Sequence, residues 1–258
     1  MTRLIVLTSG KGGVGKTTLT SNLSAALSEL GEKVIAMDAN LTTPNLGLQL
    51  GMHLAPNTLH DVLKGTTPLE NAIYPHPSGF KVIPAGLSLD DLRGVDVGRL
   101  PEISLKLIGK ADYIIMDCAA GLGREAISAL SASDEAMIIT NPDLPSVADA
   151  LKVIKIAQES NVKIIGTVVN RIRNTKNELT QSEISNILGI PIIAEIPEDN
   201  NVAMSIALKR PVIEYAPNSP ASIEIKKLAA WLTGKKYEPP KLAESRNLFF
   251  RFVEWIKG

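Results

Sequence analysis

A glycine-rich segment near the start of the chain has the residue types and spacing of a phosphate-binding loop. Residues 10–18 follow the apolar run Leu4–Leu7 and precede a helix-forming stretch. Backbone N–H groups of such a loop point at one phosphate chain, and the positive end of the following helix adds to the attraction. The Lys16 amine would reach the β- and γ-phosphates, and the Thr17 hydroxyl would ligate Mg²⁺. The predicted nucleotide-binding residues here are Gly10, Lys11, Gly12, Gly13, Val14, Gly15, Lys16, Thr17 and Thr18.

Two further charged residues fit phosphate chemistry. Lys11 cannot easily reach the γ-phosphate of its own nucleotide, but it could reach one across a symmetric interface. Asp117 ends the hydrophobic run Tyr113–Met116, and this Walker B pattern predicts a carboxylate that holds Mg²⁺ directly or through water. The alternatives are a solvated loop lysine and a helix-capping aspartate. The surrounding motifs favour the phosphate-related roles for both residues.

The elements that must position these residues follow an alternating pattern. Short β-branched runs alternate with helical stretches, which is typical of βαβ units around a parallel sheet. We expect strands at Leu4–Thr8, Lys33–Asp38, Lys81–Pro84, Tyr113–Asp117, Ala136–Thr140, Ile164–Asn170 and Ile192–Ile196. We expect helices at Lys16–Leu30, Pro101–Ile108, Arg124–Ser131, Ser146–Ser160, Glu178–Leu188, Val202–Leu208 and Ser222–Leu232, with Gly31 ending the first of them.

Polar residues stand at four of the predicted strand ends. They are Ser9 with Gly10, Asp38, Asp117 and Asn170. Ligands of parallel α/β sheets bind at the carboxyl ends of the strands, so these residues mark one predicted site.

The composition limits the fold and the partners. The 258 residues are 45% hydrophobic and 21% charged, which suits one globular α/β domain with a full core. Together with the phosphate-binding loop, this predicts a single-domain α/β P-loop NTPase fold. Such a domain has a mostly parallel twisted sheet with helices on both faces. The formal net charge is zero, which makes nucleic acid an unlikely partner. Cys118 is the single cysteine, which excludes an intrachain disulfide. No signal peptide or bilayer-length apolar run is recognisable, and we expect an intracellular protein.

The C-terminal segment differs from the rest. The stretch 234–245 is polar and contains Pro239-Pro240, which indicates a flexible linker between a domain at 1–233 and a tail at 246–258. On a helix, the tail would form an apolar stripe with basic residues on its other faces. This pattern is typical of an amphipathic helix on an anionic membrane surface, although a last helix packing on the domain is the alternative. The predicted membrane residues are Leu248, Phe249, Phe250, Phe252, Val253, Trp255 and Ile256.

The segment Lys11–Thr17 has the form K-G-G-x-G-K-[ST], and the sequence resembles the deviant Walker A ATPases of the ParA/MinD family over residues 2–233. The resemblance implies an ATP-dependent homodimer that uses Mg²⁺, with Lys11 acting in trans. Asp38–Asn40 resembles switch I of that family, and Asp117–Gly123 resembles switch II. The resemblance implies that Lys11, Lys16, Asp38 and Asn40 are catalytic residues. It also implies that Thr17, Asp38 and Asp117 are metal ligands.

The base side of the site is also taken from the resemblance. It implies that Asn170 and Arg171 read the adenine base and that Pro197, Glu198 and Asp199 flank it. An asparagine that merely ends a strand in a turn is the alternative for Asn170. The family pattern further implies that Asp149 pairs with Lys11 when ATP is absent.

Two positions depart from the family pattern. Ala119 stands where proline is usual, and Asn40 stands where a second aspartate is usual. An amide can hydrogen-bond a water molecule but cannot accept its proton. Either hydrolysis is slow, or the residue was altered to trap the ATP state, or a neighbouring residue substitutes.

The resemblance implies an ATPase of the cytoplasm that associates peripherally with the inner face of the cell membrane. Such a protein regulates cell-division site placement or positions a partner protein bound to the dimer surface. A flagellar-number regulator or another ParA-like positioning ATPase is an alternative. A nucleotide-dependent scaffold with negligible turnover is another alternative, as is a biosynthetic enzyme that uses ATP.

Overall fold

The computed structural model describes residues 1–239, and the predicted tail therefore lies outside the described residues. Its strands form one eight-stranded sheet in the order β3-β4-β2-β5-β1-β6-β7-β8. Neighbouring strands run parallel except β3 and β4. The strands are β1 (Arg3–Thr8), β2 (Val34–Ala39), β3 (Tyr74–Pro75), β4 (Lys81–Ile83), β5 (Tyr113–Cys118), β6 (Glu135–Thr140), β7 (Lys163–Ile172) and β8 (Ile192–Pro197).

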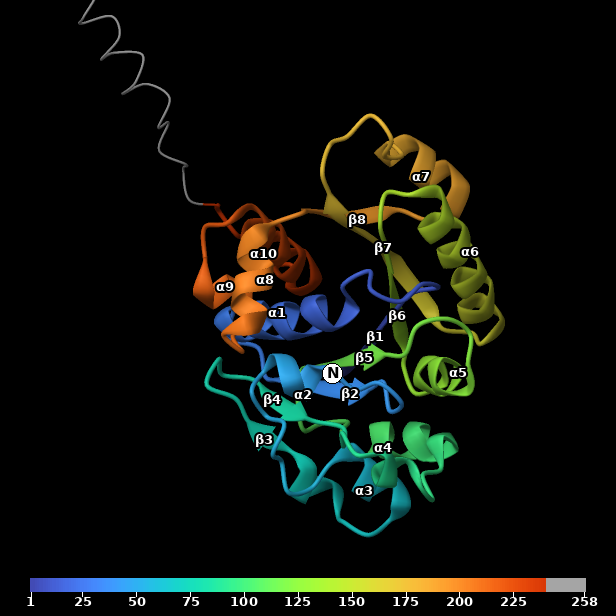
Figure 1. Ribbon diagram of the computed structural model, residues 1–258, viewed down its shortest axis with the longest axis vertical. Helices are drawn as coiled ribbons and strands as arrows, with labels where there is room; N and C mark the ends of the chain where they lie inside the picture. The colour runs from blue at the N-terminus through green and yellow to red at the C-terminus, as the bar shows by residue number, and fades with distance from the viewer. Residues whose placement is uncertain (240–258) are drawn as a thin grey trace, which may run out of the picture.

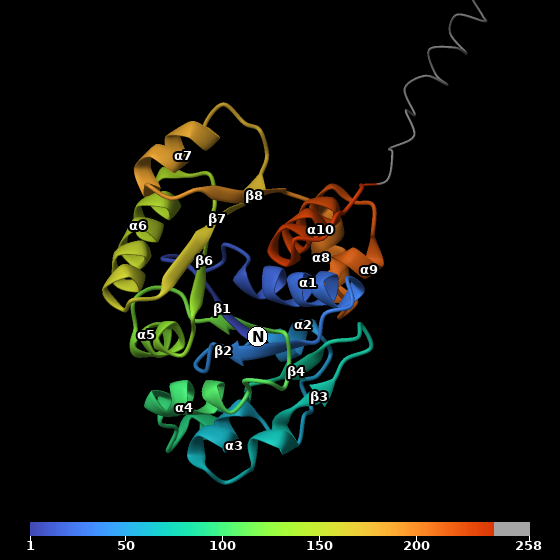
Figure 2. The same ribbon diagram turned by 180° about the vertical axis from the view of Figure 1, so that it is seen from behind.

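Helices cover both faces of the sheet, with α1 and α10 on one side and α5 and α6 on the other (Figures 1 and 2). The α-helices are α1 (Lys16–Glu29), α2 (Leu46–Gln49), α3 (Leu59–Lys64), α4 (Leu100–Leu105), α5 (Arg124–Ser131), α6 (Leu144–Glu159), α7 (Gln181–Leu188), α8 (Asn200–Ala207), α9 (Val212–Tyr215) and α10 (Pro220–Thr233). Three short 3₁₀ segments are η1 (Leu69–Ala72), η2 (Leu89–Leu92) and η3 (Val97–Arg99). Within residues 1–239, no helix is long and apolar enough to cross a membrane.

Alternation along the central strands produces the two packed faces. In β5, Tyr113 and Ile115 pack with α1 and α10, whereas Ile114 and Met116 pack with α3, α4 and α5. Successive side chains of a strand point to opposite faces, so a strand covered on both sides must be apolar throughout. The predicted α/β P-loop fold with helices on both faces is confirmed.

Several predicted helix ends were wrong by a few residues because capping side chains set them. Thr180 and Glu183 form a capping box, so α7 begins at Gln181 rather than at Glu178. Asp143 caps α6, which therefore begins before Ser146. The predicted helix 101–108 ends at Leu105, since the next three N–H groups bond three residues back instead of four.

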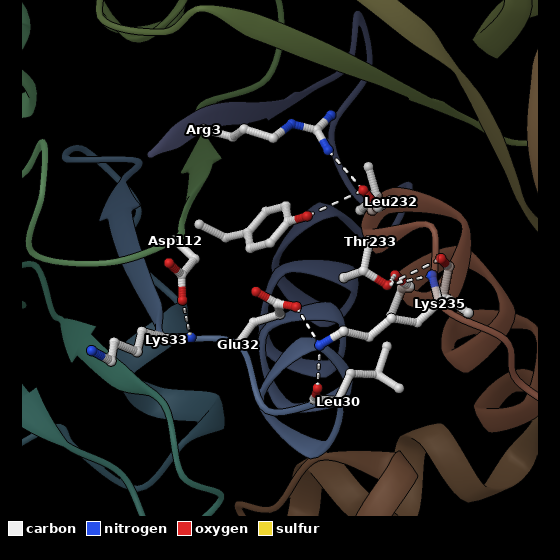
Figure 3. A network of polar contacts seen from close by, with 11 residues as sticks. Arg3, Leu30, Glu32, Lys33, Asp112, Leu232, Thr233 and Lys235 are labelled. Atoms are coloured by element: carbon white, nitrogen blue, oxygen red, sulfur yellow. Dashed lines mark hydrogen bonds and ion pairs between the residues drawn. The ribbon is translucent and has the colours of Figure 1, made fainter. Parts of the chain in front are cut away.

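A polar network at the amino-terminal ends of the strands fastens the end of α10 to the sheet (Figure 3). The Leu232 carbonyl accepts from the Arg3 guanidinium at 2.8 Å and from the Tyr113 hydroxyl at 3.1 Å. The Lys235 amine donates to the Leu30 carbonyl and to Glu32, both at 2.6 Å. The network therefore ties the ends of α1 and α10 together at the end of the sheet opposite the glycine-rich loop.

Candidate nucleotide-binding site

The loop between β1 and α1 has a backbone that requires its glycines. Gly13 and Gly15 have φ angles of 78° and 102°, in the left-handed region that side chains disfavour. A Cβ on Gly10 would lie 2.2 Å from the carbonyl oxygen of Asp149, so the start of α6 packs directly on the loop. The loop is therefore held open as a cradle of backbone N–H groups at the N-terminus of α1.

Lys16 is held inside this cradle. Only 8% of the residue is exposed, and its Nζ donates to the Ser9 hydroxyl at 2.7 Å. That hydroxyl donates in turn to the Lys11 carbonyl at 2.7 Å. Burial lowers the pKa of Lys16, while the nearby Asp117 carboxylate opposes the shift. Ser9, which the sequence marked only as one of the polar residues at the strand ends, thus fixes the amine where a phosphate would bind.

The predicted metal ligands come together at the ends of β2 and β5. Asp38 and Asp117 are direct neighbours in the parallel register of these strands, and both are completely buried. The Thr17 hydroxyl donates to Oδ2 of Asp117 at 2.5 Å. The structure therefore places Thr17, Asp38 and Asp117 side by side below the loop.

The two carboxylates strongly affect each other's ionisation. Burial raises the pKa of Asp117 to about 6, against the Thr17 hydrogen bond and the Lys16 charge. Burial, and then the Asp117 charge, raise the pKa of Asp38 well above its usual range. Backbone N–H groups of Leu46, Asn40 and Asn45 oppose this by donating to Asp38 at 3.0, 3.2 and 3.1 Å.

These residues fit a magnesium ion. Oδ1 of Asp117 is buried and has no hydrogen-bond partner among residues 1–239, so an oxygen ligand is available beside the loop. The same residues contain no group of three His, Cys, Asp or Glu side chains that could hold a metal. Mg²⁺ usually takes one or two carboxylates and completes its shell with phosphates and water. Thr17 and Asp117, with Asp38 beside them, would hold the ion, which would neutralise phosphate charge.

Asn40 is turned into its own loop. Its Nδ2 donates to the Thr43 carbonyl at 2.6 Å, and its Oδ1 accepts from the Thr43 hydroxyl at 3.1 Å. Both ends of the amide are used within the 40–45 loop, which links β2 to α2. An aspartate here would have no hydrogen for the Thr43 carbonyl. The catalytic role predicted for Asn40 stays a prediction.

Lys11 lies on the outer side of the loop, and its expected partner was wrong. Nearly half of its side chain, 49%, is exposed, and its Nζ is 3.9 Å from Oδ1 of Asp143. Asp149 pairs instead with Lys152 at 2.8 Å, since the two are three residues apart on α6. The backbone of Asp149, and not its carboxylate, is what touches the loop.

The predicted base-side residues line one pocket beside the loop. They are Asn170, Arg171, Pro197, Glu198 and Asp199, and they enclose a cavity of about 150 Å³ together with Gly15 and Thr18. Nδ2 of Asn170 donates to the Val14 carbonyl at 2.7 Å, which leaves its oxygen for a ligand. Arg171 has a φ angle of 61°, at a register shift between β7 and β8. This bulge ends the regular pairing where the pocket begins.

Glu125, at the start of α5, is a residue of the site that sequence reasoning missed. Its carboxylate accepts from the backbone N–H groups of Leu41 and Thr42 at 3.1 and 3.2 Å, and from the Thr42 hydroxyl. The partners are more than 80 residues apart in the chain. No local sequence pattern predicts such a contact. The one available indication is that Glu125 is an acidic residue in the first helical turn after a predicted switch segment.

The raised pKa of Asp117 predicts a stability that depends on pH. Because the nucleotide-free folded state binds this proton more tightly than the unfolded chain, stability is full below about pH 4 and is lost as the pH rises through about 6. Asp117→Asn removes the loss, so the variant should be more stable than wild type by about 1–3 kcal/mol at pH 7, with a smaller difference toward pH 4. Urea unfolding at several pH values measures this.

The exposed Asp134 supplies the control. Asp134→Asn should follow the wild-type pH profile. If the stability of wild type and of Asp117→Asn changed with pH in the same way, the raised pKa could not be assigned to Asp117. The Asp117→Asn variant should also lose magnesium-dependent tightening of nucleotide binding.

Known proteins resemble this chain over nearly its whole length. The ParA family model, described as NUBPL iron-transfer P-loop NTPase, matches residues 1–233. An uncharacterized ATP-binding protein of Methanocaldococcus jannaschii is 39% identical over 254 residues, covering 98% of this chain and 96% of that protein.

Solved structures agree with the sequence relatives. The septum site-determining protein MinD of Pyrococcus horikoshii, complexed with Mg-ADP, is 37% identical with a TM-score of 0.87, over 90% of this chain and 96% of that chain. A chain of the MinC:MinD cell division protein complex of Aquifex aeolicus is 32% identical with a TM-score of 0.81, over 94% and 100%. This chain belongs to the ParA/MinD family of P-loop NTPases.

Proposed function

We propose that the chain is an ATPase that dimerises around ATP, associates with a membrane and takes part in placing the cell-division site. The observation that carries the proposal is the contrast between two lysines of one loop. Lys16 is buried within the cradle, whereas the side chain of Lys11 is 49% exposed. A solvent-facing cation beside a phosphate site is suited to a nucleotide held by a second copy. The relatives named for MinD and its complex with MinC support the cell-division role and a protein partner.

The residues of the site would have different roles in phosphoryl transfer from ATP to water. Lys16 and the N–H groups of the loop would bind the phosphate chain. Gly121 lies close to the start of that loop, because its backbone N–H donates to the Ser9 carbonyl at 2.9 Å. Lys11 of the opposite copy would stabilise charge on the transferring group, as an arginine finger does. Thr17 and Asp117, with Asp38 beside them, would hold the magnesium ion that neutralises phosphate charge.

The two lysines should separate binding from dimerisation. Lys16→Ala should abolish nucleotide binding, because it removes the buried cation of the cradle. Lys11→Ala should keep the nucleotide Kd within about fivefold of wild type, since an exposed charge contributes roughly 1 kcal/mol or less. It should nevertheless lose the ATP-dependent dimer. Light scattering in ADP and then in Mg·ATP measures the mass.

Lys152→Ala, on the neighbouring α6, is the matched control and should dimerise like wild type. A wild-type chain that stays monomeric in saturating Mg·ATP would sink the dimer proposal.

Membrane association rests on the predicted tail and on where the described chain ends. Pro239 lies in a groove with Ile172 and Pro197, at the carboxyl ends of β7 and β8. Pro197 also lines the base pocket. The described residues therefore end at the nucleotide end of the molecule, although the network of Figure 3 holds the C-terminal end of α10 at the opposite end. We propose the inner face of the cell membrane as its location.

A chain ending at Tyr237 tests this role. With ATP and anionic vesicles, the full chain should float with the lipid and the truncated chain should stay in solution. Dimerisation adds a second tail, so ATP should raise the apparent affinity for the vesicles by about 10²-fold or more, and flotation should increase accordingly. Replacing Phe249 and Phe252 by serine in the full chain provides the length-matched variant. Equal flotation of full and truncated chains would end the membrane proposal.

The amide at position 40 favours slow turnover, and a scaffold with negligible hydrolysis is the second candidate function. Both ends of the Asn40 side chain are satisfied by Thr43, and an amide cannot accept a proton from water. Asn40→Asp should raise kcat by about 10²-fold, the lower end of the range for general acid–base catalysis. Steady-state ATPase assays with and without lipid measure this, with Asn45→Asp as the control. Equal rates for wild type and Asn40→Asp would remove Asn40 from the mechanism.

A further inference from the structure

We propose that Glu125 is a positioning residue that couples the 40–45 loop to the phosphate-binding loop, so that both respond to the γ-phosphate together. The inference rests on the proposed ATPase function and assigns a residue to its regulation. Glu125 belongs to α5, which follows the 119–123 loop at the end of β5. Its side chain reaches across to a segment that follows β2.

The contact is built from several hydrogen bonds to one carboxylate. Oε2 accepts the N–H groups of Leu41 and Thr42 at 3.1 and 3.2 Å, and Oε1 accepts the Thr42 hydroxyl. Hydrogen bonds to an ionised acceptor are about twice as strong as those between neutral groups. Because three donors of the 40–45 loop bond to this one carboxylate, Glu125 fixes the position of the loop.

The 40–45 loop has no carboxylate of its own to do this. Its sequence is Asn-Leu-Thr-Thr-Pro-Asn, and the amide of Asn40 is already used on Thr43. Asp38, the preceding acid, accepts from the N–H groups of Asn40, Asn45 and Leu46 and so holds the two ends of the loop. The middle of the loop, at Leu41 and Thr42, is held by Glu125.

The 119–123 loop, which precedes α5, connects Glu125 to the phosphate site. The Gly121 N–H donates to the Ser9 carbonyl at 2.9 Å, and the Ser9 hydroxyl accepts from Lys16 at 2.7 Å. A continuous path therefore runs from Lys16 through Ser9 and the 119–123 loop to Glu125, and from there to Thr42. A γ-phosphate that takes Lys16 or the Gly121 N–H as its partner acts on this path directly.

Hydrogen exchange measures the coupling at the amides concerned. In Glu125→Gln, one oxygen becomes an NH₂ group that cannot accept, so peptides covering 40–46 should exchange about 10-fold faster than in wild type. In wild type, a non-hydrolysable ATP analogue should change exchange in both 40–46 and 119–123 relative to ADP. In Glu125→Gln only the 119–123 change should remain.

Controls separate a positioning role from a general loss of structure. Glu159→Gln, at an exposed carboxylate near the end of α6, should behave as wild type. Thr42→Val removes one donor and should give a smaller effect, which is not additive with Glu125→Gln. In steady state, Glu125→Gln should lower kcat by about 10-fold while the nucleotide Kd stays within twofold.

Wild-type exchange of 40–46 in the nucleotide-free Glu125→Gln variant would overturn the inference, as would a nucleotide Kd that rises in step with the fall in kcat. Failure of the wild-type chain to bind nucleotide would instead overturn the proposed function. The nucleotide-free exchange comparison would still decide whether Glu125 holds the loop.

Discussion

Asp38 and Asp117 end neighbouring parallel strands and lie side by side without exposed surface, in a place where water cannot screen their charges. The surrounding structure is arranged to balance this charge. The N–H groups around α2 serve Asp38, while the Thr17 hydroxyl and the Lys16 amine serve Asp117. One buried oxygen of Asp117 is still without a partner among the described residues. The fold thus keeps a cation-binding position at the centre of its sheet, below a loop that attracts phosphate.

The sheet and the loop could be predicted because their signals are local. Gly31 does end α1, with a φ angle of 86°, and the apolar run before Asp117 forms a strand buried on both faces. The polar strand ends do meet at one edge, since parallel strands align their carboxyl ends. Short elements such as α2, α9 and β3 were missed because a few residues carry no periodicity.

Contacts between distant segments could not be predicted. Lys11 lies nearest Asp143 rather than Asp149, which depends on how α6 meets the loop through Gly10. The orientation of the Asn40 amide toward Thr43 and the reach of Glu125 to Thr42 are likewise set by tertiary packing. The contacts of Lys11 and Glu125 join segments that lie far apart in the sequence. They decide how firmly each loop is held, which the motifs alone do not state.

Because of the paired carboxylates, binding of a divalent ion at this site would be coupled to the release of a proton. With the pKa of Asp38 well above its usual range, this carboxyl group keeps its proton at pH values where a surface aspartate would have released it. Ligation of magnesium would require the ionised form, so its binding would release that proton into the solvent. The apparent affinity for a magnesium nucleotide therefore declines as the medium becomes more acidic, even though the nucleotide's own contacts with the loop are unchanged.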